Sequence, residues 1–130
     1  WLKKKSYMQL YKQEEYYKII GLCMEVHRVL GGGLLEIVYK EALEIEFKIH
    51  NIPYEREKEF IINYKGYELS KRFYADFVVF DEIILEVKAR KIIVDEDIAQ
   101  TLHYMSITKS GLGIIANFSL KSLQQKRLVL

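Results

Sequence analysis

The stretch YADFVVFDEIILEVKAR, Tyr74 to Arg90, decides the fold. Its β-branched and aromatic residues predict two buried strands that are joined by a short turn near Asp81. Inside these strands, however, stand Asp76, Glu86 and Lys88. Burying a carboxylate without a partner costs on the order of several kcal/mol, so the three charged residues need an explanation.

The length of the turn decides whether the three charges meet. Glu86 and Lys88 are two residues apart, so their side chains leave the same face of the strand. A two-residue turn, Asp81 and Glu82, would put Asp76 on the opposite face. A three-residue turn, Asp81 to Ile83, gathers all three charges on one face. Its strand pairs are Phe80 with Ile84, Val78 with Glu86 and Asp76 with Lys88, and its other face is apolar, with Phe77, Val79, Leu85 and Val87.

Two carboxylates gathered in this way require a cation or a wet cleft. Lys88 neutralises one of them, and a divalent metal such as Mg²⁺, which takes hard oxygen ligands, would satisfy the remainder. The alternative is a charged surface patch on a half-exposed sheet, which periodicity alone leaves equally open. The neighbouring segments DFVVF and IILEV disfavour the patch, because they are too apolar for strands that face water.

Length and composition set bounds on the protein class. A chain of 130 residues, half of them hydrophobic, predicts one folded domain over 1–130. The formal net charge of +2 is too small for binding nucleic acid through the overall field, so such binding would need a local basic surface. With one cysteine, Cys23, and no apolar run of about 18 residues, we expect a soluble cytoplasmic protein without a membrane partner.

The pattern along the chain predicts an α/β (α+β) fold, with a central mixed sheet flanked by helices. The glycine triplet at 31–33 is better explained as a helix end and tight turn than as a phosphate loop, because no Lys-Ser/Thr follows it. The predicted order is helix 14–30, helix 34–50, strands 57–64 and 67–80 around a Lys65-Gly66 hairpin turn, strand 83–89, helix 94–111 with Asp95 as N-cap, strand 112–118, and a further strand in the tail 122–130.

The helix at 34–50 carries a carboxylate in an unexpected place. Glu36 lies at helical spacing from Tyr39, Leu43 and Phe47, at the edge of the face that should meet the core. It either has a partner there or interacts with the helix N-terminus, and the two explanations are equally good. Leu35, Val38, Ala42, Ile45 and Ile49 form a neighbouring apolar row, and we expect Lys40, Glu41, Glu44 and Lys48 to point to water.

These residues together resemble a known family. Asp76 followed after ten residues by Glu86-Val87-Lys88 resembles the D…(D/E)XK core of the PD-(D/E)XK nuclease superfamily, with Ala75 where the superfamily name has proline. GLLEIVY, 33–39, is similar to the GxxExxY signature of one small prokaryotic family within it. Gln100 and Tyr104 follow as Q-x-x-x-Y. The resemblance covers about 21–118, with 1–13 as an N-terminal extension, and implies a restriction-endonuclease-like αβββαβ core with an extra N-terminal helix.

The resemblance also implies roles for the residues. Asp76 and Glu86 would ligate Mg²⁺, for which Mn²⁺ could substitute, with the Val87 carbonyl and Glu36 as further ligands. Lys88 would orient the attacking water and offset charge in the transition state. The implied catalytic set is Glu36, Asp76, Glu86, Lys88 and Gln100, with Tyr39 and Tyr104 as supporting residues.

The best basic cluster for a phosphate backbone lies beside this set. It comprises Lys71, Arg72, Arg90 and Lys91 around Lys88, although a solvated charged rim explains these residues almost as well. His27 and His50 are expected to be helix residues rather than ligands, because no second His or Cys stands at metal-site spacing from either. His103 is expected to have a surface or packing role, because it points away from the helix face that Gln100 and Tyr104 share.

The expected function is therefore that of a hydrolase, a metal-dependent phosphodiesterase that cleaves nucleic acid, with DNA as the expected substrate. So small a domain would need a partner or a homodimer to place its cut. The alternative is a nucleic-acid or protein binding module that keeps the nuclease fold without cleaving, since fold does not fix function.

Overall fold

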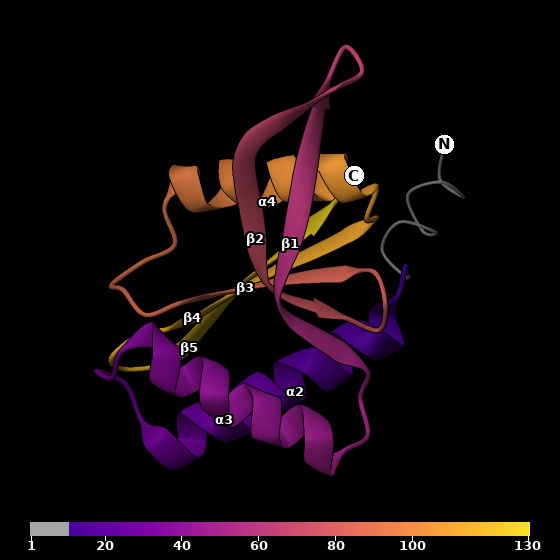
Figure 1. Cartoon of the computed structure of the whole chain (residues 1–130). Coiled ribbons are helices and arrows are strands. Elements are labelled where there is room, and N and C mark those ends of the chain that lie inside the picture. The colour runs from indigo at the N-terminus through magenta and orange to yellow at the C-terminus, as the bar shows by residue number, and fades with distance from the viewer. Residues whose placement is uncertain (1–10) are drawn as a thin grey trace, which may run out of the picture.

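The computed structural model describes residues 11–130, so most of the predicted extension at 1–13 lies outside the described residues. Within these residues, three helices and five strands form an α+β fold (Figure 1). In chain order they are α2 Gln13–Leu30, α3 Glu36–Ile49, β1 Tyr54–Tyr64, β2 Tyr67–Val79, β3 Ile83–Lys88, α4 Asp95–Thr108, β4 Leu112–Phe118 and β5 Leu123–Val129. The predicted element order is confirmed, including the strand in the tail.

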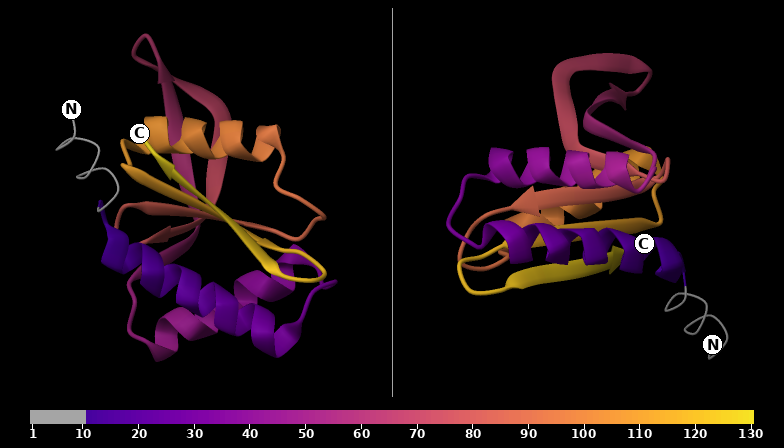
Figure 2. Two further views of the ribbon diagram at one scale, coloured as in Figure 1. Left: turned by 180° about the vertical axis from the view of Figure 1, so that it is seen from behind. Right: turned by 90° about the horizontal axis from the view of Figure 1, so that it is seen from below.

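The five strands make one mixed sheet in the order β1-β2-β3-β4-β5. Only β3 and β4 are parallel, and α4 makes the crossover that a parallel connection requires. α2 and α3 lie side by side on one face of the sheet, and α4 lies on the other (Figures 1 and 2). This arrangement confirms the predicted restriction-endonuclease-like architecture.

Two apolar clusters hold the layers together. The larger one joins α2 and α3 to the sheet and includes Phe47, Phe77 and Leu85, all fully buried. The smaller one packs Tyr104 and Met105 of α4 against the opposite face. β3 and β4 lie between the two clusters, and this explains why both strands are almost continuously buried.

The glycine triplet connects α2 to α3 by a tight turn, as predicted. The Gly31 N–H donates to the His27 carbonyl at 2.8 Å and ends α2. Gly32 packs on the turn between β4 and β5, where a Cβ would lie 2.4 Å from the Cα of Leu120. Tyr39 fastens this loop from α3, because its hydroxyl donates to the Gly31 carbonyl at 2.7 Å and accepts from the Leu34 N–H at 3.2 Å.

The turn between β2 and β3 differs from the predicted one. The observed pairs are Phe77 with Leu85, Val78 with Ile84 and Val79 with Ile83, so the three-residue turn is Phe80 to Glu82 rather than Asp81 to Ile83. Phe80 and Asp81 adopt left-handed φ angles of 53° and 68°, and the Phe80 N–H donates to the Pro53 carbonyl at 2.9 Å. The shift brings Asp76 level with Glu86 instead of Lys88 but keeps both carboxylates on one face.

The buried face of α3 is also rotated from the predicted one. Tyr39, Leu43 and Phe47 are fully buried, whereas Leu35, Ile45 and Ile49 are exposed. The core therefore takes the aromatic row. The rotation turns Lys40, expected in water, toward the sheet, where its side chain is only 14% exposed.

β1 and β2 continue beyond the rest of the sheet as a two-stranded arm, which comprises residues 60–73 (Figure 1). At its base, Phe73 packs edge-on against Tyr104 of α4, with 6.1 Å between ring centroids. At its tip the predicted hairpin turn is confirmed, with left-handed φ angles of 50° at Lys65 and 86° at Gly66. Tyr67 beside the turn is 75% exposed, so the tip presents aromatic side chains to solvent.

Candidate active site

The site lies at a fork in the sheet, where β2 and β3 separate beyond the Phe77–Leu85 pair. We call Asp76, Glu86 and the backbone around them the fork. The Asp76 N–H donates to Glu86 Oε2 at 3.2 Å, and the Val87 N–H donates to Asp76 Oδ2 at 2.7 Å. The two carboxylates thus take the place of the backbone pairing that would otherwise continue the ladder.

Glu86 is the least satisfied group of the fork. The residue is 3% exposed, and its Oε1 is buried without a hydrogen-bond partner among the described residues. Burial, followed by the neighbouring Asp76, raises the pKa of Glu86 to about 9, against a smaller opposing effect of Lys88. Such a perturbed carboxyl group is a frequent mark of a functional site.

α4 brings one predicted residue to the fork and leaves another in solvent. Tyr104 is buried, and its pKa is raised by burial and then by the negative charges of Glu86 and Asp76, which places it beside both carboxylates. Gln100, one turn earlier, is exposed, and its side chain makes no hydrogen bond within residues 11–130. Its catalytic role stays a prediction.

Lys88 has a partner that the sequence analysis missed. Its Nζ lies 4.0 Å from Oδ1 of Asp97, a buried carboxylate in the first turn of α4, and Nη1 of Arg90 lies 3.3 Å from the same oxygen. Asp97 Oδ2 accepts from the Val94 N–H at 3.1 Å, so Asp97 also caps the helix. The predicted N-cap, Asp95, is wrong: the cap residue is Val94. The feature of the sequence that could have indicated this contact is the run of acidic residues in the first turn of α4, Asp95, Glu96 and Asp97.

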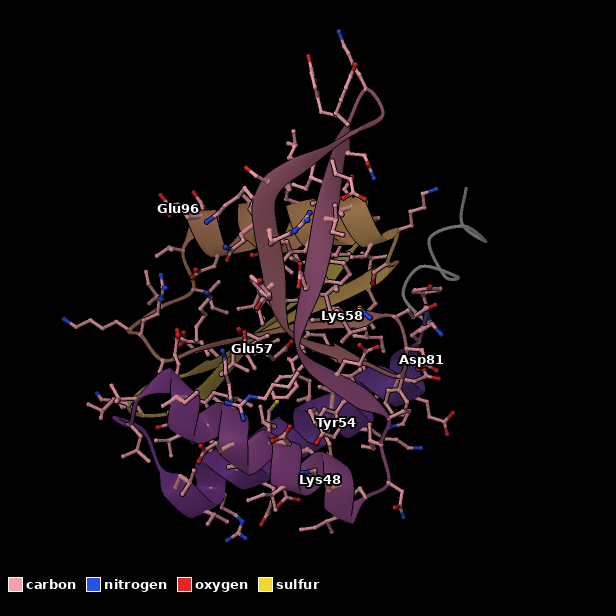
Figure 3. All side chains as sticks on the ribbon, viewed as in Figure 1. Lys48, Tyr54, Glu57, Lys58, Asp81 and Glu96 are labelled. Carbon is pink, nitrogen blue, oxygen red and sulfur yellow. The ribbon has the colours of Figure 1, made fainter. Side chains whose placement is uncertain are left out.

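The cation closest to Asp76 is Lys40 of α3. Its Nζ lies 2.9 Å from Asp76 Oδ1 and 2.7 Å from Glu57 Oε1. Figure 3 shows Glu57 where the arm meets the rest of the sheet, above α3. The prediction that Lys40 points to water is wrong, because positions 36, 40, 43 and 47 also share one helix face and the core lies on that side.

Glu36 and Tyr39 of the GxxExxY pattern have different surroundings. Tyr39 is fully buried, fastens the glycine loop and stacks on Phe118 with 4.4 Å between ring centroids. Glu36 is the first residue of α3 and is partly buried, and its side chain forms no hydrogen bond or ion pair within residues 11–130. The structure therefore gives Tyr39 a structural role, whereas the role of Glu36 as a ligand stays a prediction.

The predicted basic residues lie on two segments that diverge from the fork. Lys71 and Arg72 belong to the arm, where Nε of Arg72 lies 3.2 Å from Glu59 Oε1. Arg90 and Lys91 follow β3 in the connection to α4. The arm and the connection from β3 to α4 run in different directions from the sheet (Figure 1).

The fork suits a divalent cation. Within residues 11–130 no group of three or more His, Cys, Asp and Glu side chains is arranged to hold a metal. The fork itself contributes two carboxyl groups, those of Asp76 and Glu86. The buried Glu86 Oε1 without a hydrogen-bond partner is a hard oxygen donor that such a cation would satisfy. A cation would also offset the repulsion between the two carboxylates.

Comparison with known proteins agrees with this geometry. The sequence profile of the PD-(D/E)XK nuclease superfamily matches residues 13–128, nearly the whole described chain. The chain belongs to the PD-(D/E)XK nuclease superfamily. The matched range includes Asp76 and the Glu86-Val87-Lys88 triplet.

A solved structure shares the fold. The structure titled "Crystal structure of SSO0001" superposes with a TM-score of 0.57 at 18% sequence identity, over 71% of this chain and 49% of that one. This PD-(D/E)XK chain therefore spans about half the length of that structure. No curated protein matches. Among the described residues, no helix is long and apolar enough to cross a membrane.

Proposed function

We propose that the protein is a magnesium-dependent nuclease of the GxxExxY family that hydrolyses phosphodiester bonds in DNA. The observation that carries the proposal is Glu86 Oε1, a buried carboxyl oxygen beside Asp76 that has no hydrogen-bond partner within residues 11–130. Membership of the PD-(D/E)XK nuclease superfamily supports the reaction class.

Asp76 and Glu86 would hold the cation, with the Val87 carbonyl and Glu36 as further ligands and Mn²⁺ as a substitute for Mg²⁺. When bound, such a cation lowers the pKa of a water molecule and stabilises charge on the phosphodiester. The Val87 N–H holds Asp76 Oδ2 and the Asp76 N–H holds Glu86 Oε2, so both carboxylates are oriented before any cation arrives.

Lys88 would orient the attacking water and offset the negative charge that builds on the phosphate. Asp97 restrains the Lys88 ammonium from the α4 side. Tyr104 closes one side of the fork and keeps part of it dry, and Gln100, exposed one turn away, would contact the substrate or the water. Tyr39 acts indirectly, because it fastens the loop that leads to Glu36.

The substrate would lie across the fork. Lys71 and Arg72 on the arm and Arg90 and Lys91 after β3 would contact phosphates on either side. These residues recognise charge and not base identity, so little sequence preference is expected. A homodimer would allow paired cuts by so small a domain. The buried free thiol of Cys23 suits the reducing cytoplasm, where we place the protein.

The test is incubation of the purified protein with labelled single-stranded, double-stranded and branched DNA and with RNA, each with Mg²⁺, Mn²⁺ or EDTA. We expect metal-dependent cleavage of DNA that Glu86→Gln abolishes. Glu41→Gln, which removes an exposed carboxylate of α3, is the matched control and should cleave like the parent. Cleavage in EDTA, or equal cleavage by the Glu86 variant, would contradict the proposal. Binding without cleavage of any substrate would instead favour a binding module.

A further inference from the structure

Lys40 belongs to neither sequence pattern, yet it is the cation in closest contact with the fork within the described residues. Its Nζ bridges Glu57 Oε1 at 2.7 Å and Asp76 Oδ1 at 2.9 Å. Both Lys40 and Asp76 are largely buried, with side chains 14% and 15% exposed. The pair is thus shielded from the solvent that weakens ordinary surface ion pairs.

The backbone of β1 is distorted where it meets Lys40. Glu57 has a left-handed φ of 54° in the middle of a strand, a conformation that is costly for a residue with a side chain. Pairing between β1 and β2 includes Arg56 with Phe77 and Lys58 with Ala75 but skips Glu57. The distortion lies at the position next to Asp76, and there the Glu57 carboxylate reaches Lys40.

Lys40 remains a charged group in this setting. Its ammonium lies 2.7 Å and 2.9 Å from two carboxylate oxygens, which favour its charged form. A full positive charge therefore lies against one of the two carboxylates of the fork.

We propose that Lys40, anchored by Glu57, is the counter-ion of Asp76 and sets the affinity of the fork for divalent cations. This inference rests on the proposed function, since it requires that Asp76 and Glu86 bind a metal. Lys40 is a positioning residue, because it acts through Asp76.

Removal of Lys40 and removal of Glu57 should change the metal affinity in opposite directions. The Lys40 ammonium repels a cation at Asp76, so its removal should tighten metal binding. Glu57 partly neutralises that ammonium, so its removal should weaken metal binding. Loss of a merely structural contact would weaken binding in both cases, because the carboxylates would lose their orientation.

The experiment is titration of the metal-free protein with Mn²⁺, with free Mn²⁺ measured by electron paramagnetic resonance. We expect Lys40→Met to bind at least about tenfold more tightly than the parent, because it removes a positive charge that lies against a proposed metal ligand. Glu57→Gln should bind a few-fold more weakly, and the double variant should return toward the parent. Lys40→Arg, which keeps the charge, should stay near the parent.

Lys48→Met is the matched control, because it removes an exposed lysine of the same helix, and its affinity should not change. Melting curves in EDTA identify any variant that fails to fold. If Lys40→Met does not fold, tighter or unchanged binding by Glu57→Gln still overturns the inference.

The outcomes separate the two proposals. If the parent binds no Mn²⁺, or Glu86→Gln binds as well as the parent, the proposed metal site fails. If the parent binds and Glu86→Gln does not, but Lys40→Met binds equally or more weakly, the site stands and the role of Lys40 is overturned.

Discussion

Two adjoining regions of β2 and β3 differ in the side chains that they bury: the paired region buries apolar side chains, and the fork buries acidic ones. Where the strands are paired, Phe77 and Leu85 are fully buried, and Phe77 packs edge-on against Phe47 with 5.4 Å between ring centroids. One residue further on, at the fork, Asp76 and Glu86 face each other, and Glu86 Oε1 has no hydrogen-bond partner in the part of the chain that the structure describes. The paired part of the strands therefore stabilises the fold, whereas the fork retains an unfavourable arrangement that a ligand would relieve.

The largest expected effect lies on the paired side. Phe77→Ala should lower the free energy of unfolding by about 3–5 kcal/mol, because it leaves a large cavity in the main cluster. The matched change beyond the fork, Tyr74→Ala, removes a half-exposed ring and should cost less than about 1 kcal/mol. Urea denaturation in EDTA measures both, and equal losses would erase the distinction between the two regions.

At the fork, by contrast, a substitution should raise the stability of the metal-free protein. Glu86→Gln should stabilise the metal-free protein near neutral pH by about 1–3 kcal/mol, because the buried Glu86 has to take up a proton on folding and the neutral amide does not. Mg²⁺ should stabilise the parent and not the variant. Thermal unfolding with and without Mg²⁺ checks both statements, and a variant less stable than the metal-free parent would contradict them.

The raised pKa of Glu86 predicts that the stability of the metal-free protein depends on pH. The pKa of Glu86 is raised from 4.5 to about 9, so the folded state retains a proton that the unfolded chain releases across this range. Its contribution to stability is thus present in acid and is lost as the pH rises toward 9. In EDTA, the advantage of Glu86→Gln over the parent should be larger at pH 8 than at pH 5.5. An advantage independent of pH would show that Glu86 does not hold the proton.

A smaller effect is expected where α4 meets the fork. Asp97→Asn should cost about 1–2 kcal/mol, since it weakens a helix cap and the charge that Lys88 and Arg90 share. DNA cleavage should also fall, because Lys88 loses its restraint. Asp95→Asn, an exposed acid of the same turn, is the control for both readouts. Parent-like cleavage by Asp97→Asn would show that Lys88 needs no anchor.

The smallest effect on stability is expected at the arm tip. Tyr67→Ser should change the free energy of unfolding by less than about 0.5 kcal/mol, because the ring is 75% exposed. It should weaken DNA binding a few-fold if the arm lies along the substrate, since exposed aromatic rings stack on bases. Fluorescence anisotropy with Ca²⁺ in place of Mg²⁺ measures the affinity, and unchanged binding would remove the arm from the interface.

The sequence predicted the elements and the carboxylate pair, because period-two and helical spacing are local properties. The predicted turn between β2 and β3 is one position too late in the chain. Asp76 and Glu86 nevertheless lie on one face, because the observed and predicted registers give Asp76 the same face of the sheet. Lys40 and Asp97 were missed for another reason. Both act through contacts between elements far apart in the chain, and helical spacing left two candidate faces for α3 that only packing decides.

The central claim is that the fork is a divalent-metal site. Anomalous diffraction from crystals grown with Mn²⁺ tests it most directly. We predict an anomalous peak about 2.0–2.2 Å from carboxylate oxygens of both Asp76 and Glu86, the range for such a hard cation. The peak should be absent from crystals of Glu86→Gln grown under the same conditions. Bound Mn²⁺ elsewhere in the parent with none at the fork would contradict the account.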